Sequence, residues 1–181
     1  MDERTARKVA EEARDTEWRL PSFGKQLFLG DLRLDLVHPH PRPDDLSRRR
    51  GEEFLERLRE FCAAKVDPAV IEREARIPDE VVQGLRDIGA FGMKIPERYG
   101  GLGLSQLYYG RALMVAGSVS PAIGALLSAH QSIGVPQPVK LFGTDEQKET
   151  WLPRCARQVS AFLLTEPDVG SDPARLRSTA V

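Results

Sequence analysis

The sequence predicts a mainly α-helical protein with one short strand near its carboxyl end. Apolar residues recur at helical spacing over residues 51–153, and signals that start or stop helices divide this pattern into short segments. An apolar run with strand character follows at 159–164. Of the 181 residues, 41% are hydrophobic and 29% are charged, and the formal net charge is −1, which is typical of a globular protein.

Charge and cysteine usage exclude several classes of function. Basic and acidic residues are interleaved without a basic stripe, so no nucleic-acid partner is predicted. Cys62 and Cys155 lie far apart, which predicts neither a disulfide framework nor a zinc site and fits a reducing compartment. His38 and His40 stand in a proline-rich stretch without further ligands, so no metal is expected.

The amino terminus lacks the apolar core of a secretory signal, and no apolar run approaches the roughly 20 residues that span a bilayer. We therefore expect a cytoplasmic protein without a membrane span.

Residues 1–49 differ from the rest of the chain. They are rich in charge, and prolines at 21, 39, 41 and 43 interrupt regular structure. Between these breaks, three leucines alternate with charged residues, which predicts one short half-buried strand: Leu32, Leu34 and Leu36. We interpret residues 1–49 as an amino-terminal extension.

From Gly51 the apolar spacing becomes helical. The first helix gathers its apolar residues on one face: Phe54, Leu55, Leu58, Phe61, Cys62 and Val66. A second helix is predicted to open at Pro78 and to stop at Gly89, since proline suits a first turn and glycine follows a last one. A loop with paired glycines follows at 92–103, where we interpret Tyr99-Gly100-Gly101 as a connection between helices.

Two central helices come next. Ser105 is predicted to cap a helix whose inner side carries Tyr108, Ala112, Val115 and Val119, with Tyr109 on the surface. Ser120-Pro121 starts a helix that is apolar nearly all round and is therefore expected to be buried. His130 on that helix is interpreted as a core or interface histidine with satisfied hydrogen bonds.

The last helices have clear local signals. A short helix around Val139–Phe142 is ended by Gly143, and Thr144 with Gln147 forms a capping-box signature for the next, which is expected to stop near Pro153. The apolar run 159–164 is interpreted as a strand that leads into a Pro-Asp turn.

The segment from Leu164 to Asp172 carries the chemistry. Its strand delivers the Thr165 hydroxyl, and the backbone N–H groups around Gly170 and Ser171 can bind an anion. A hydroxyl at this place can also donate to the edge of a planar heterocycle. Taken alone, these residues are more typical of an ordinary turn between structural elements than of a binding site.

Three motifs together resemble the acyl-CoA dehydrogenase family. They are Ile95–Gly103 (IPERYGGLG), Leu141–Lys148 (LFGTDEQK) with Trp151-Leu152-Pro153 after it, and Phe162–Ser171 (FLLTEPDVGS). Their order and separations match over roughly residues 50–181. The resemblance implies an all-helical amino-terminal domain at 50–158, followed at 159–181 by the first strand of a truncated central β-domain. It also implies an FAD enzyme that oxidises the Cα–Cβ bond of an acyl-CoA thioester.

The resemblance also implies roles for single residues. Cofactor contacts fall on Phe162, Leu163, Leu164, Thr165, Gly170 and Ser171. Thr165 matches the hydroxyl donor to the flavin ring, and Ser171 matches a position that contacts both cofactor and acyl-CoA. Glu166 either orients the loop or forms an ion pair. The family's catalytic base, a glutamate of the carboxy-terminal domain, is expected beyond Val181, so no catalytic residue is assigned here. We expect these 181 residues alone neither to bind FAD tightly nor to catalyse the reaction.

Partners follow from the same resemblance. An electron-transferring flavoprotein is the expected electron acceptor, and the full-length protein is expected to form a homo-oligomer.

Two alternative functions stay open from the sequence. An acyl-CoA oxidase would pass electrons to oxygen. Assays that compare flavin reoxidation by oxygen with reoxidation by an electron-transferring flavoprotein would distinguish it from a dehydrogenase. The second alternative is a non-catalytic helical interaction module. In that case the nucleotide sequence after codon 181 would not encode a β-rich stretch followed by a helical segment with the catalytic glutamate.

Overall fold

The computed structural model describes residues 4, 8, 21–40 and 42–179. Contacts divide the chain into two compact units. The helical unit comprises Pro43–Phe162, and the second unit comprises the described residues up to Arg42 together with those from Leu163 onward. The two units are described separately below.

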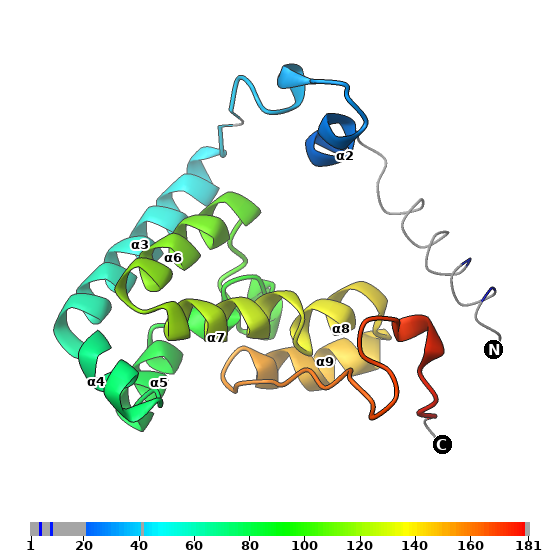
Figure 1. The fold of residues 1–181 in the computed structure, drawn as a ribbon. Coiled ribbons are helices and arrows are strands. Elements are labelled where there is room, and N and C mark those ends of the chain that lie inside the picture. Colours follow the sequence, from blue (N-terminus) through cyan, green and yellow to red (C-terminus); the bar gives the residue numbers. More distant parts are fainter. Residues whose placement is uncertain (1–3, 5–7, 9–20, 41, 180–181) are drawn as a thin grey trace. The chain divides into compact units, whose positions relative to one another are not determined.

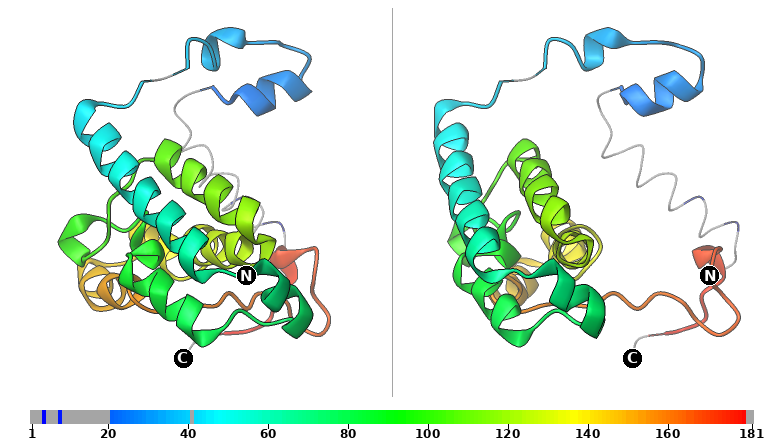
Figure 2. Two further views of the ribbon diagram at one scale, coloured as in Figure 1. Left: turned by 90° about the vertical axis from the view of Figure 1, so that its left-hand side faces the viewer. Right: turned by 60° about the vertical axis from the view of Figure 1, so that its left-hand side comes forward.

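The helical unit consists of seven α-helices and two single 3₁₀ turns within residues 43–162 (Figure 1). In chain order they are α3 (Asp45–Lys65), α4 (Pro68–Glu74), α5 (Asp79–Asp87), η2 (Ala90–Gly92), η3 (Glu97–Tyr99), α6 (Gln106–Val119), α7 (Pro121–Ser132), α8 (Pro136–Phe142) and α9 (Asp145–Cys155). Helix α3 packs along α6, α6 packs on α7, and α8 packs on α9 (Figure 1), and Figure 2 shows α3 and α6 side by side from two further directions. This arrangement confirms the predicted mainly helical fold.

Helix α3 buries the face that its sequence predicts. Phe54, Leu55, Leu58 and Cys62 are buried in the main core, with Phe61 and Val66 packed against it half-buried. The helix begins at Asp45, six residues before Gly51, because the Asp44 side chain accepts a hydrogen bond from the Ser47 N–H at 2.8 Å and caps the first turn. Periodicity alone missed this polar first turn.

The connections after α5 use glycine as predicted. Helix α5 follows Pro78, and Gly89 after its end has a φ of 83°, in the region that favours glycine. Gly100 has a φ of 80° directly after η3, and a side chain at Gly101 would overlap the Ile95 carbonyl. The Tyr99-Gly100-Gly101 turn thus has a structural explanation, in agreement with its interpretation as a connection.

Three predictions about α6 and α7 need correction. The Ser105 hydroxyl occupies the N-cap position without making a cap hydrogen bond. Tyr109 is buried rather than on the surface, because α7 lies beside α6 and the Ser132 hydroxyl lies 2.7 Å from the Tyr109 hydroxyl. Helix α7 is buried on one side only: Ile123, Leu127, His130 and Gln131 are buried, whereas Ala122, Ala125 and Ala129 are exposed.

Helix α9 starts as predicted and ends later. Thr144 and Gln147 form the complete capping box. The helix continues past Pro153 to Cys155, since the buried Leu152 and Cys155 hold its last turn against Ile95 and Tyr99 in a second, smaller core cluster. Packing therefore outweighs the loss of one backbone donor at the proline.

The structure differs from the predictions at the carboxyl end of the helical unit and in the second unit. The second unit contains α2 (Phe23–Phe28), η1 (Leu34–Leu36) and η4 (Pro173–Arg175). The strand predicted at 32–36 is a 3₁₀ turn, because backbone bonds such as Leu36 N–H to Arg33 O close it on itself. The strand predicted at 159–164 is not formed either. A strand requires a paired neighbour, and the described residues contain only an isolated bridge between Glu166 and Val169. No helix among the described residues is both long and apolar enough to cross a membrane.

Candidate functional site

His130 lies on α7 and contacts Ser160, close to the end of the helical unit at Phe162. Its imidazole is buried where α7 meets η2 and the end of α9, and it makes a T-shaped contact with the Phe91 ring, with ring centroids 5.5 Å apart. Nε2 lies 3.1 Å from the Phe91 carbonyl oxygen and 3.0 Å from that of Cys155. Nδ1 accepts the Ser160 N–H at 3.1 Å and lies 2.8 Å from the Ser160 hydroxyl. The predicted satisfied core histidine is confirmed.

These partners define the protonation state of His130. The Ser160 N–H can only donate, so Nδ1 is the acceptor and Nε2 carries the proton that the two carbonyls accept. Burial lowers the pKa of His130, although hydrogen bonds to the Phe91 and Cys155 carbonyls act in the opposite direction. The folded protein therefore holds a neutral imidazole.

Stability is expected to decrease as the pH falls from about 7 to about 5. Because the folded pKa of His130 is lowered, the unfolded chain takes up this proton first, below its ordinary pKa of about 6.5. The stabilising contribution of the neutral His130 imidazole is present above that pH and is lost as the pH falls. Urea unfolding at several pH values in this window measures the effect. His130→Gln, which does not titrate here, should show a flatter dependence, and an equally steep one would contradict the assignment to His130.

The cofactor-facing residues predicted from the sequence are exposed. Phe162 is 51% exposed and Leu163 is 96% exposed, and Leu164 and Thr165 are exposed as well. Phe162 is the last residue of the helical unit, and Leu163 to Ser171 belong to the second unit. Exposed apolar side chains in succession are costly in water and are typical of a surface that meets another group.

The turn after Thr165 is well defined. Glu166 and Val169 exchange two backbone hydrogen bonds, N–H of Glu166 to O of Val169 at 3.0 Å and N–H of Val169 to O of Glu166 at 3.1 Å. Pro167 and Asp168 form the tip, and Val169 is buried. Thr165 therefore directly precedes this turn, and Gly170 directly follows it.

Glu166 holds this turn to the segment that follows. Its carboxylate accepts the Ser178 N–H at 2.8 Å and the Arg177 N–H at 2.9 Å. Hydrogen bonding from Ser178 and Arg177 lowers the pKa of Glu166, so the carboxylate is ionised. Of the two roles proposed for Glu166, the structure supports the one in which it orients the loop.

The donors around the turn fit the cofactor that the resemblance implies. In the described part of the chain, the Thr165 hydroxyl and the backbone N–H groups of Gly170 and Ser171 donate no hydrogen bond. A side chain added at Gly170 would meet no atom within 4 Å, and its φ does not require glycine. The space in front of Gly170 is therefore left open by the chain itself. Exposed unused donors beside an open backbone suit an anionic or heterocyclic group.

Sequence reasoning missed the partners of His130 and Glu166. Ser160 lies 30 residues from His130, and the Glu166 carboxylate binds backbone 11 and 12 residues further on. No local pattern marks such long-range contacts. The buried Gln131 was also missed, although a polar residue next to a core histidine could have indicated a hydrogen-bond network.

Known proteins match the chain over most of its length. The family model described as acyl-CoA dehydrogenase, N-terminal domain, matches residues 49–158. A probable acyl-CoA dehydrogenase of Mycobacterium tuberculosis is 60% identical over 181 residues, which cover 99% of this chain and 28% of that protein. The human mitochondrial very long-chain specific acyl-CoA dehydrogenase is 38% identical, with 88% of this chain and 25% of that protein covered.

A solved structure agrees with these relatives. The glutaryl-CoA dehydrogenase of Mycobacterium smegmatis in complex with FADH₂ matches with a TM-score of 0.57 and 28% identity, covering 75% of this chain and 34% of that one. The chain thus spans about a quarter to a third of the length of the proteins it resembles. Since the family model covers more than half of the chain in the region of the helical unit, the protein belongs to the acyl-CoA dehydrogenase family.

Proposed function

We propose that this chain supplies one side of the FAD and acyl-CoA site of an enzyme that dehydrogenates the Cα–Cβ bond of an acyl-CoA thioester. The observation that carries the proposal is the fixed turn Glu166–Val169, which is flanked by the unused donors of Thr165, Gly170 and Ser171. FAD, when bound, accepts the hydride of this oxidation. The FADH₂ bound by the Mycobacterium smegmatis neighbour supports this cofactor.

Each residue of the segment has a proposed part. The Thr165 hydroxyl donates to the edge of the flavin ring, where it stabilises the negative charge that grows there during reduction. Ser171 contacts both cofactor and acyl-CoA, and Gly170 allows the backbone to approach them. The exposed Phe162, Leu163 and Leu164 supply apolar contact. None of these residues can act as the base, which we assign to a glutamate outside residues 1–181.

Removing the Thr165 hydroxyl is expected to weaken FAD binding. In the full-length protein, Thr165→Val keeps the side chain's shape but loses one hydrogen bond, worth about 0.5–1.5 kcal/mol, so the dissociation constant should rise by about 2- to 12-fold. Titration with FAD, followed by quenching of flavin fluorescence, measures the change.

Thr165→Ser is the matched control, since it keeps the hydroxyl and loses only a methyl group. It should bind FAD nearly as well as the parent protein. Equal losses in the valine and serine variants would contradict the donor role of Thr165. A full-length protein that holds no flavin at all would contradict the proposed function itself.

The proposed partners follow from the same function. An electron-transferring flavoprotein would reoxidise the flavin, and we propose that the full-length protein forms a homo-oligomer. The cytoplasm is the proposed compartment, and the free thiols of Cys62 and Cys155, both buried, are compatible with reducing conditions.

A further inference from the structure

We propose that His130 is a positioning residue for the flavin-facing segment: its Nδ1 fixes the backbone of Ser160 and thereby sets the direction in which the chain runs to Thr165. The role in flavin binding rests on the function proposed above. The anchoring of Ser160 rests on the helical unit alone, which contains both residues.

Ser160 packs against His130 and Val135 within the helical unit. Its N–H and hydroxyl both meet His130 Nδ1, and its hydroxyl also accepts the Val135 N–H at 3.2 Å. Gly134 leaves the space that Ser160 occupies, because a side chain at position 134 would come within 2.6 Å of the Ser160 hydroxyl. Both the backbone and the side chain of Ser160 are thus held.

The imidazole that holds Ser160 is itself hydrogen-bonded at both nitrogens. On its other side, Nε2–H is shared between the carbonyls of Phe91 and Cys155. The neighbouring Gln131, also fully buried, donates to the same Phe91 carbonyl and accepts the Lys94 N–H at 3.0 Å. A ring fixed at both nitrogens, next to a second fixed side chain, gives the supporting shell that a binding site requires.

Ser160 is the last fixed point before the turn. Between Ser160 and Glu166, the backbone of residues 161–165 makes no hydrogen bond to the described chain. Thr165 is therefore held from two ends only, by the Ser160 anchor and by the Glu166–Val169 turn. Loss of the first anchor leaves five residues free to change direction, and a misplacement of about 1 Å weakens a binding site considerably.

Two substitutions separate the two sides of the imidazole. His130→Asn places an amide oxygen near the position of Nδ1 and keeps an acceptor for Ser160, but it loses the donor to Phe91 and Cys155. His130→Gln reaches further, so its amide nitrogen keeps that donor near the position of Nε2 while the acceptor for Ser160 is lost. A purely structural role of His130 in the core predicts similar losses for both variants.

The first test measures hydrogen exchange of the Ser160 amide by NMR. Anchoring by Nδ1 predicts that exchange is about fivefold faster in His130→Gln than in His130→Asn, which corresponds to one hydrogen bond. Helix propensity favours glutamine over asparagine on α7, so it acts against this expectation rather than producing it. Equal exchange rates, or faster exchange in the asparagine variant, would overturn the anchor.

The second test uses the full-length protein with FAD. His130→Asn should keep the dissociation constant and the visible circular dichroism of the bound flavin close to the parent values, whereas His130→Gln should raise the constant about fivefold and change the spectrum. Unchanged flavin binding in the glutamine variant would overturn the positioning role. If the parent protein binds no flavin, the proposed function fails, and the exchange rates decide the anchor by themselves.

Discussion

Replacing Leu127 with alanine is expected to lower the free energy of unfolding by about 2–5 kcal/mol. Leu127 is fully buried on α7, within the main core formed with α3 and α6. The substitution removes apolar area from the core and leaves a cavity that the surrounding helices fill only in part. Urea unfolding monitored by circular dichroism measures the loss as a lower midpoint with an unchanged slope.

Leu163→Ala is the control with the same chemistry. Leu163 is 96% exposed, so this substitution should change stability by no more than about 0.5 kcal/mol. A loss in Leu127→Ala as small as in Leu163→Ala would mean that α7 does not close the core. Leu163→Ala also tests the proposed function, because it removes the apolar contact that we propose for the flavin without disturbing the fold.

The parts of the fold that sequence predicts best have a local cause. The capping box at Thr144 and Gln147 involves residues three positions apart, and Gly89 is required by its own backbone angle. The buried face of α3 follows from periodicity within one helix. In each case the interacting groups are neighbours in sequence, so the sequence contains the whole of the interaction.

The wrong predictions involve partners far away along the chain. Alternating leucines at 32–36 and the apolar run at 159–164 have strand character, but a strand forms only against a paired neighbour. The predicted exposure of Tyr109 is wrong because its burial depends on α7, which lies beside it only in the folded unit. Helix α9 passes Pro153 because packing of Leu152 outweighs the proline signal.

The candidate site shows the same division. The donors at Thr165, Gly170 and Ser171 are adjacent to one turn, so a continuous motif can indicate them. The support that we propose for them comes from His130, which is remote in sequence and meets Ser160 only in the folded protein. We expect supporting residues of a site to be harder to predict than contacting ones, since they act through packing and not through a motif.

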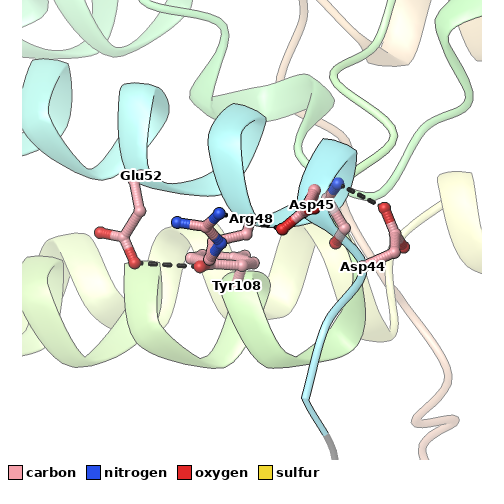
Figure 3. A network of polar contacts seen from close by, with 6 residues as sticks. Asp44, Asp45, Arg48, Glu52 and Tyr108 are labelled. Carbon is pink, nitrogen blue, oxygen red and sulfur yellow. Dashed lines mark hydrogen bonds and ion pairs between the residues drawn. The ribbon is translucent and has the colours of Figure 1, made fainter.

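Gly51→Ala is expected to destabilise the helical unit by about 1–3 kcal/mol, although alanine normally stabilises a helix interior. Gly51 faces the Tyr108 ring where α3 crosses α6, and a side chain there would overlap the ring atoms nearest the Tyr108 backbone. Figure 3 shows Tyr108 beside α3, where its hydroxyl donates to Glu52 at 2.9 Å. The ring is buried and held at its far end, so it cannot turn away without losing this bond.

Gly110→Ala provides the opposite result for the same exchange. Gly110 lies inside α6, and an added side chain there meets no atom within 4 Å. Only the gain in helix propensity remains, so this variant should be more stable by about 0.5–1 kcal/mol. Urea unfolding of both variants against the parent protein compares them directly. If Gly51→Ala were also more stable than the parent protein, helix propensity alone would govern both sites, and α3 and α6 would not be in close contact at Tyr108.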